Sequence, residues 1–207
     1  MINSILSSIS SLVLNIISGW GYWGVMLLMA LESANIPIPS EIILPFAGFL
    51  VSTGRFGFAS VVLVAAIGNL VGSLINYYVA YYYRDKAVAI LTKTHLITED
   101  ELERSTKWFE RRGVAAVFLG RFLPVIRTFI SFPAGMFRVN IIKFSILTFM
   151  GSFLWSVALT YIGYLAGSNW NVLEPYFRQF DYLVVLAIVV AIFFEVRRRF
   201  KRSKVLK

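Results

Sequence analysis

Four ionisable side chains stand inside otherwise apolar stretches of this 207-residue sequence, two of each sign. Glu32 and Glu41 lie in the stretch LESANIPIPSEIILPFAGFL, which follows thirty residues without a charged side chain. Arg121 and Arg127 lie in the stretch GRFLPVIRTFISFPAG. A guanidinium can hold a phosphate group through two parallel hydrogen bonds, and a buried carboxylate can carry a proton. We therefore expect Arg121 and Arg127 to bind an anionic substrate and the two glutamates to couple to protons.

The composition places these charges in a membrane. Hydrophobic residues make up 58% of the chain and charged residues only 15%, which is typical of a multi-spanning membrane protein. On insertion scales, each charge buried in a bilayer costs roughly 2.5–3.5 kcal/mol. Four isolated charges would be strongly unfavourable, whereas acids and arginines that face each other would largely compensate.

Prolines interrupt both charged stretches. The prolines predicted to break them are Pro37, Pro39, Pro124 and Pro133. Each half of residues 22–50 has room for about ten helical residues, or about 15 Å, whereas the hydrocarbon core is about 30 Å thick. Neither half can cross alone, so we predict re-entrant helical hairpins over 22–50 and over 113–137. The break also lets Glu32 and Glu41 converge, because they would point to opposite faces of an unbroken helix.

The remaining segments predict further helices. They are an amphipathic helix 2–18, a transmembrane helix 57–83, a charged amphipathic helix 98–112, a transmembrane helix 141–166, a last transmembrane helix 181–196 and a basic tail 197–207. The predicted fold class is an all-α polytopic membrane protein, with residues 1–207 forming a single membrane domain.

The order of these elements occurs twice. Residues 1–84 and residues 98–167 each contain an amphipathic helix, a re-entrant hairpin and a transmembrane helix. Two short sequence matches accompany this order. Gly24-Val25 precedes Glu32 by eight residues, as Gly113-Val114 precedes Arg121, and Ala47-Gly48 near the end of the first hairpin matches Ala134-Gly135 near the end of the second. In transporters built from inverted repeats, the broken segments meet near the bilayer midplane and form the substrate site. The sequence therefore predicts an inverted repeat followed by a C-terminal transmembrane helix.

The basic residues predict the orientation. Sixteen of the twenty Lys and Arg fall on one predicted side, including seven in the tail 197–207, whereas only Arg55 and Arg178 fall on the other. Because cytoplasmic loops carry an excess of Lys and Arg, we expect a multi-pass protein of the cell inner (cytoplasmic) membrane with a cytoplasmic C-terminus. The net charge of +9 comes largely from these flanking clusters, which argues against nucleic acid as a partner.

Small and polar residues form a stripe on each of the two long predicted helices. The polar members of these stripes are Asn69, Ser73, Asn76, Thr148, Ser152 and Ser156. Such stripes are typical of closely packed membrane helices, and packing is the role that we expect for them.

The motifs ESANIPIPSE with AGFL, and GRFLPVIRTFISFPAG, resemble those of the DedA family of bacterial membrane proteins, which is related to the eukaryotic VTT-domain lipid scramblases. The resemblance implies transport of an anionic lipid between leaflets, a phospholipid or a polyprenyl phosphate such as undecaprenyl phosphate. It also implies coupling to the proton or sodium gradient, with an acid pair and an arginine pair that correspond to the four charged residues above. Ser40 stands where many relatives have Gly, which leaves the lipid open.

Other interpretations are also open. The two glutamates could lie in a surface loop, and Arg121 could extend to the headgroups. Two carboxylates could serve a membrane-embedded lipid-modifying enzyme as acid and base, and the chain could be an ion exchanger or an assembly factor acting indirectly on the envelope. With no cysteine and one histidine, we expect no metal centre, no cofactor and no enzyme activity. The oligomeric state is left open, with a homo-oligomer among the expectations.

The predicted hairpin over 22–50 can be tested by labelling. Cysteines introduced at Tyr22 and at Thr53 should both react with a membrane-impermeant thiol reagent added from the outside, because both ends of a re-entrant hairpin lie on one side of the bilayer. Labelling of the two positions from opposite sides would contradict both the hairpin and the inverted repeat.

Overall fold

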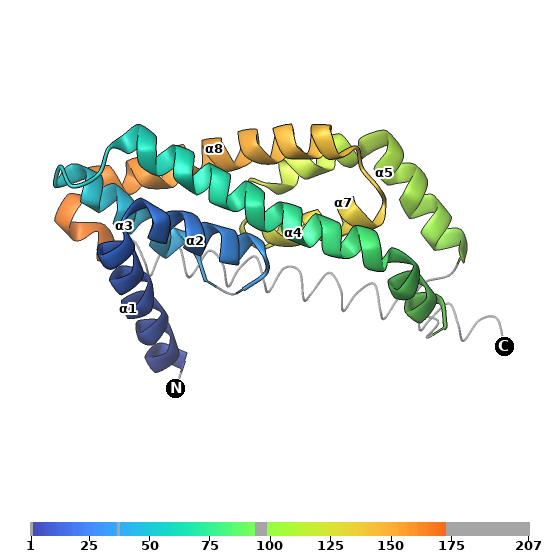
Figure 1. The fold of residues 1–207 in the computed structure, drawn as a ribbon, viewed down its shortest axis with the longest axis horizontal. Helices are drawn as coiled ribbons and strands as arrows, with labels where there is room; N and C mark the ends of the chain where they lie inside the picture. Colours follow the sequence, from blue (N-terminus) through green and yellow to red (C-terminus); the bar gives the residue numbers. More distant parts are fainter. Residues whose placement is uncertain (1, 37, 94–98, 173–207) are drawn as a thin grey trace.

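The computed structural model of the chain describes residues 2–36, 38–93 and 99–172, and every regular element within these ranges is helical (Figure 1). In chain order the helices are α1 (Ile2–Trp20), α2 (Tyr22–Ser33), α3 (Ser40–Ser52), α4 (Phe58–Lys93), α5 (Glu99–Gly120), α6 (Pro124–Phe129), α7 (Ser131–Met136), α8 (Ile141–Ala166) and the 3-10 helix η1 (Gly167–Val172). The all-α prediction is confirmed for these residues. The predicted last helix 181–196, the tail 197–207 and Pro37 lie outside them.

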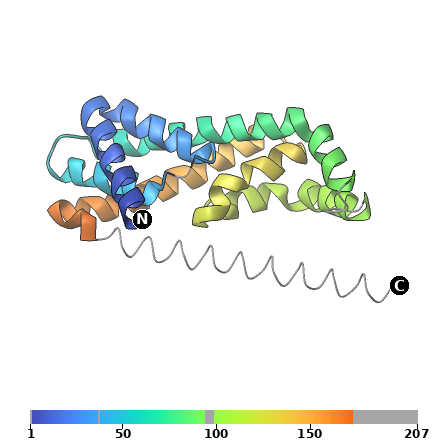
Figure 2. The same cartoon turned by 90° about the horizontal axis from the view of Figure 1, so that it is seen from below.

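Helices α4 and α8 form the frame of the molecule. They run along its long axis (Figures 1 and 2) and pack against each other. Their segments Phe58–Lys86 and Ile141–Asn169 are each 29 residues long, with mean hydropathies of 2.2 and 1.6, so both are long and apolar enough to cross a membrane. This agrees with the predicted transmembrane helices 57–83 and 141–166. In the structure α4 continues without interruption to Lys93.

The predicted hairpin over 22–50 consists of two short helices, α2 and α3, of 12 and 13 residues. Between them, Asn35 adopts a left-handed backbone conformation with φ of 66° and Pro39 is extended. The chain turns back there, because the start of α2 lies beside the residues that follow α3. The ring of Tyr22 stacks on Phe56 at 4.7 Å, and its hydroxyl accepts a hydrogen bond of 2.8 Å from the Gly57 amide.

The second predicted hairpin begins inside a longer helix. Helix α5 combines the predicted amphipathic helix 98–112 with the first half of the hairpin, because it continues through Gly113 to Gly120. A turn follows, and α6 starts at Pro124, where a missing N–H is tolerated. Pro133 cannot donate to the carbonyl of Phe129, the residue at which α6 ends. This second break is mild, because Ile130 keeps right-handed helical angles before α7 begins.

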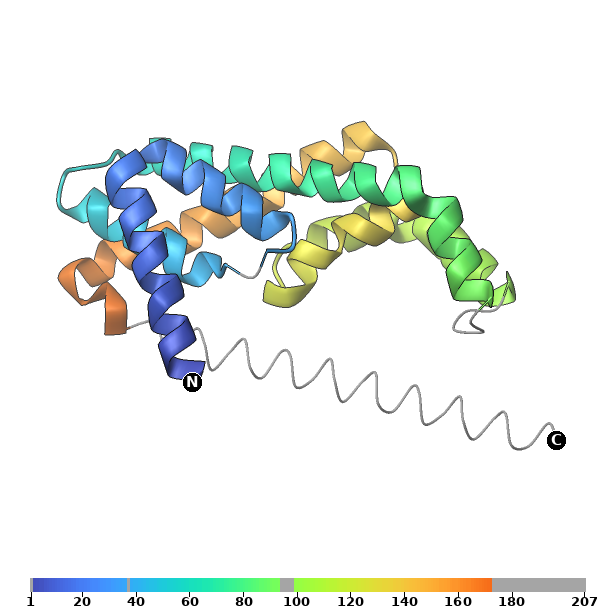
Figure 3. The same ribbon diagram turned by 60° about the horizontal axis from the view of Figure 1, so that its bottom comes forward.

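Helices α3 and α7 each pack against the long helix of the other half, α3 on α8 and α7 on α4 (Figure 3). A Cβ atom on Gly48 in α3 would lie 2.2 Å from the Thr160 carbonyl oxygen in α8, and one on Gly135 in α7 would lie 2.1 Å from the Tyr77 carbonyl oxygen in α4. These backbones are therefore in direct contact, and only glycine fits at either position. The two Ala-Gly pairs matched in the sequence thus occupy corresponding contacts.

A further close contact between α3 and α8 predicts a large stability effect. A Cβ atom on Gly163 in α8 would lie 2.1 Å from the carbonyl oxygen and 2.5 Å from the Cα atom of Pro45 in α3. Because backbone atoms cannot move aside easily, Gly163→Ala should lower the stability by at least about 1–3 kcal/mol. Thermal unfolding of the purified protein in detergent measures the effect.

Gly19→Ala is the matched control for Gly163→Ala. Its new methyl group would meet nothing within 4 Å, and alanine favours the helix that contains it. Equal melting temperatures for the two variants would contradict the close approach of α3 and α8.

Candidate functional site

Three of the four predicted charged residues meet in one buried cluster. Arg127, in α6, is only 2% exposed, and its Nη2 atom forms an ion pair with Oε1 of Glu32 at the end of α2. The same Nη2 lies 3.9 Å from Oε1 of Glu41 in the first turn of α3. Glu32 is 5% exposed and Glu41 is 7% exposed. The structure therefore brings the two acids of the first hairpin to one arginine of the second.

Ser40 and Trp155 complete this cluster, although neither was predicted as a site residue. The amide of Ser40 donates a hydrogen bond of 2.9 Å to Oε1 of Glu32, and its hydroxyl accepts one from Arg127. The indole Nε1 of Trp155 in α8 also donates to the Ser40 hydroxyl at 3.3 Å. The Trp155 ring lies 4.9 Å from the Arg127 guanidinium, a cation–π distance. The sequence offers one signal for Ser40, its position between Pro39 and Glu41, but none for Trp155.

Arg121 has a different environment. It is 2% exposed, and no acid lies within ion-pair distance of it among the described residues. Its five hydrogen-bond acceptors, at 2.9–3.4 Å, are all neutral: the side chains of Asn69, Ser73, Ser131 and Thr148 and the carbonyl oxygen of Arg127. The four hydrogens on its two Nη atoms are thus occupied. The structure joins Arg121 to the cluster through the backbone of Arg127, without a contact to either glutamate.

The polar stripes of the long helices do more than pack. Asn69 and Ser73 of α4 and Thr148 of α8 hold Arg121, and Ser152 donates a hydrogen bond of 2.6 Å to the Asn69 side chain. The stripes were visible in the sequence, but the guanidinium between them was not. Asn69, Ser73 and Thr148 accept hydrogen bonds from an arginine that is distant in the chain, a contact that spacing alone cannot predict.

The cluster lies halfway along both long helices. Gly72 is the middle residue of Phe58–Lys86, and Trp155 is the middle residue of Ile141–Asn169. Gly72 is next to Ser73, which binds Arg121, and Trp155 packs on Arg127. If both segments cross a bilayer, the charged residues are at the depth where an unpaired charge is least favourable.

Some polar atoms of the cluster have no hydrogen-bond partner. They are Oε2 of Glu32, Oε1 of Glu41 and the Nε atoms of Arg121 and Arg127. Buried polar groups are usually paired, so unpaired ones mark capacity for a further ligand or for rearrangement. The cluster can therefore accept an anion at the arginines or a cation at the carboxylates.

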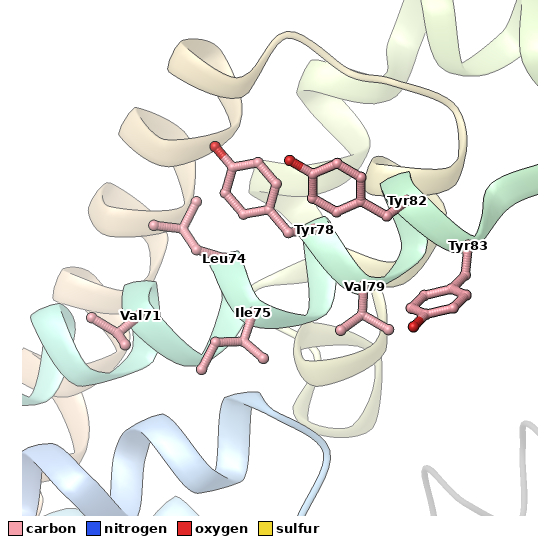
Figure 4. A pocket seen from close by; sticks show the side chains of 7 residues that line it. All are labelled: Val71, Leu74, Ile75, Tyr78, Val79, Tyr82 and Tyr83. Atoms are coloured by element: carbon pink, nitrogen blue, oxygen red, sulfur yellow. The ribbon is translucent and has the colours of Figure 1, made fainter.

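A separate apolar groove of about 450 Å³ lies on the outer face of α4 (Figure 4). Its lining residues are Val71, Leu74, Ile75, Tyr78, Val79, Tyr82 and Tyr83. None of the four charged residues lines it. The groove suits hydrocarbon, whereas the polar chemistry is in the buried cluster.

The VTT domain matches residues 38–165, more than half of the chain and a range that contains Glu41, Arg121 and Arg127. The chain belongs to the DedA (VTT-domain) family of membrane proteins. This confirms the resemblance found in the sequence. No solved structure matches this DedA-family chain.

Two relatives of the DedA-family chain are named undecaprenyl phosphate transporter A. The protein from Bacillus subtilis is 31% identical over 95% of this chain and 100% of its own length, and that from Staphylococcus aureus is 29% identical over 94% and 98%. A Lactococcus lactis protein, 31% identical over 91% of this chain and 92% of its own length, is named alkaline phosphatase-like. The family and the transporter names support the prediction that this DedA-family chain is not an enzyme.

The ion pair predicts a measurable stability effect. Arg127→Met would leave Glu32 and Glu41 buried without a cation, and breaking such a pair from one side costs about 3–5 kcal/mol. The double variant Arg127→Met/Glu32→Gln should recover part of the loss, because it removes one of the uncompensated charges. Thermal unfolding in detergent compares the two.

Lys107→Met is the control for Arg127→Met, since it breaks the exposed pair of Lys107 with Glu103 in α5, which is 2.6 Å long. It should change the melting temperature little, because solvent screens such pairs. A loss in Arg127→Met no larger than in Lys107→Met would show that the buried pair is not formed in solution.

Proposed function

We propose that this DedA-family protein moves an anionic lipid between the leaflets of the cytoplasmic membrane. Polyprenyl phosphate, such as undecaprenyl phosphate, is the first candidate because of the names of the Bacillus and Staphylococcus relatives. A phospholipid is the second. The observation that carries the proposal is Arg127, a guanidinium buried halfway along two membrane-length helices and neutralised by carboxylates from a distant segment.

The architecture proposed for this function is an inverted repeat with two re-entrant hairpins. Helices α2 and α3, at 12 and 13 residues, are too short to cross a hydrocarbon core of about 30 Å. The reciprocal packing of α3 on α8 and of α7 on α4 supports the repeat, because a two-fold relation predicts both contacts. In such transporters the broken segments carry the substrate site at mid-depth.

Arg127 is the proposed ligand of the lipid phosphate. In the observed state its Nη2 is taken by Glu32 and Ser40, and its Nε is unpaired. A phosphate that replaces the Glu32 carboxylate would engage the planar fork bidentately, with the Trp155 ring still supporting the guanidinium. Arg121 would contribute positive charge near the phosphate. Only its unpaired Nε could donate a hydrogen bond to the phosphate, since its Nη atoms are already occupied.

The carboxylates are the proposed coupling groups. When a phosphate takes Arg127, Glu32 and Glu41 lose their cation and gain a neighbouring negative charge. Both changes favour uptake of a proton or a sodium ion by the acids. Lipid binding and cation binding are then positively linked, and the linkage acts in both directions. A cation gradient could drive lipid movement through this linkage.

The orientation in the membrane is part of the same proposal. The basic residues near the end of α4, in α5 and in the tail 197–207 support a cytoplasmic location for these segments, because cytoplasmic loops carry an excess of Lys and Arg. The first hairpin then opens outward and the second opens inward. The lipid headgroup would enter from either side and meet Arg127 between them.

The proposed function is tested by Arg127→Lys in proteoliposomes. The purified protein should flip labelled undecaprenyl phosphate or one of a panel of labelled phospholipids. Arg127→Lys should lose most of this activity although the charge is retained, because an ammonium cannot replace a planar two-pronged donor. The initial rate of lipid movement is the readout.

Arg111→Lys is the matched control for Arg127→Lys, an identical replacement at an exposed position of α5, and it should flip lipid normally. Near-normal flipping by Arg127→Lys at equal protein content would mean that Arg127 only balances charge. Lack of flipping of every lipid tested by the parent protein would refute lipid transport.

A further inference from the structure

Oxygen atoms without a hydrogen-bond partner occur on both of the packed helices α3 and α8. On α3, Glu41, Pro45 and Gly48 follow one another at helical spacing, and Pro45 and Gly48 both contact the α8 backbone. On α8, Ser156, Thr160 and Gly163 have the same spacing. Contacts of α3 reach the Thr160 carbonyl and Gly163. The two helices run in parallel, because Ser40 bonds Trp155 at one end and Gly48 meets Tyr164 at the other (Figure 3).

This parallel alignment places Glu41 about one helical turn before the closest contact on α3, and Ser156 on the corresponding part of α8. Ser156 and Thr160 are 0% exposed, yet neither hydroxyl has a hydrogen-bond partner. Oε1 of Glu41 is also buried without one. Pro45 adds to this set, because it has no N–H to donate to the Glu41 carbonyl four residues earlier. Three buried side-chain oxygen atoms without a hydrogen-bond partner therefore lie on these two helices, among apolar side chains.

The charge of the neighbouring cluster selects the sign of a ligand. Among the described residues, Arg127 is the cation within ion-pair distance of Glu32 and Glu41. One guanidinium thus serves two carboxylates. Glu32 has the closer contact and an additional amide donor, whereas Glu41 has only the 3.9 Å contact. The formal charges of the two buried glutamates and the two buried arginines balance, but Arg121 contacts neither acid, so Glu41 is the less compensated carboxylate and the one at which a monovalent cation would bind.

We propose that Glu41, Ser156 and Thr160 form a binding site for a sodium ion between α3 and α8. Carboxylate, hydroxyl and carbonyl oxygens are the ligands that hard cations prefer, and broken membrane helices often supply them. A divalent ion is a poorer match, because no group of three or more acidic or histidine side chains occurs in the described residues. This proposal rests on the proposed function in one respect. If the protein transports lipid, the sodium ion would be the coupling ion and Glu41 the acid that binds it.

Sodium binding is measured on the purified full-length protein in detergent, without lipid substrate. The melting temperature is recorded in sodium, potassium and choline chloride at constant ionic strength and pH, and radioactive sodium binding is measured in parallel. Sodium should raise the melting temperature in a saturable way, and potassium and choline should not. Glu41→Gln should abolish sodium binding. Ser156→Ala and Thr160→Val should each weaken it by at least about tenfold, and Thr160→Ser should restore it.

Ser33→Ala is the matched control for the hydroxyl variants. The Ser33 hydroxyl is likewise fully buried and unpartnered, but it belongs to α2. Its loss should leave sodium affinity unchanged, so an equal effect of Ser33→Ala would overturn the site. A melting temperature that depends on pH through Glu41 but not on sodium would also overturn it, because a proton needs neither Ser156 nor Thr160.

The experiments test the sodium site and lipid transport independently of each other. Saturable sodium binding that requires Glu41, Ser156 and Thr160 supports the site even if proteoliposomes flip no lipid. Lipid flipping without any sodium dependence of binding or stability overturns the site and leaves the proposed transport standing.

Discussion

The structure depends on the compensation of charges that are buried in an apolar chain. Arg127 is neutralised by Glu32, which lies 95 residues earlier in the sequence, so the pair forms only if the two halves meet. A buried guanidinium with neither an anion nor a full set of neutral acceptors would be strongly unfavourable in an apolar surrounding. The end of α2, the start of α3 and the short helix α6 must therefore converge at the middle of α4 and α8. Glycines at the helix contacts permit the close approach that this convergence requires.

The two arginines are compensated by different means, and the difference has chemical consequences. Arg121 is held by neutral oxygens from α4, α7 and α8 and by the backbone of Arg127. These contacts fix the turn that precedes α6 without using a carboxylate. Arg127 instead is paired with a carboxylate. In the proposed function, an exchange of this carboxylate for the lipid phosphate would leave the supports of the turn intact, so the lipid would bind and leave without dismantling the second hairpin.

Much of the fold follows from local properties of the chain. Hydropathy predicts α4 and α8 because membrane-length apolar segments are unmistakable, and the proline at position 124 marks the start of α6 because it lacks an N–H. The continuation of α5 through Gly113 was not predicted, since a glycine is tolerated inside a helix that packs well. The break predicted at Pro133 is mild in the structure. Pro133 lies close to the start of a helix, where the chain keeps helical angles despite the missing hydrogen bond.

The sequence by itself determined that four charges stand in apolar segments, that prolines interrupt these segments and that opposite signs lie in opposite halves. These are properties of composition and spacing. Only the tertiary structure decided that both acids meet Arg127, that Arg121 has neutral partners and that Ser40 and Trp155 join the cluster. The physical reason is that side chains at the ends of short helices have partners set by how helices cross. That crossing depends on backbone contacts, such as Gly163 on Pro45, between residues more than a hundred positions apart.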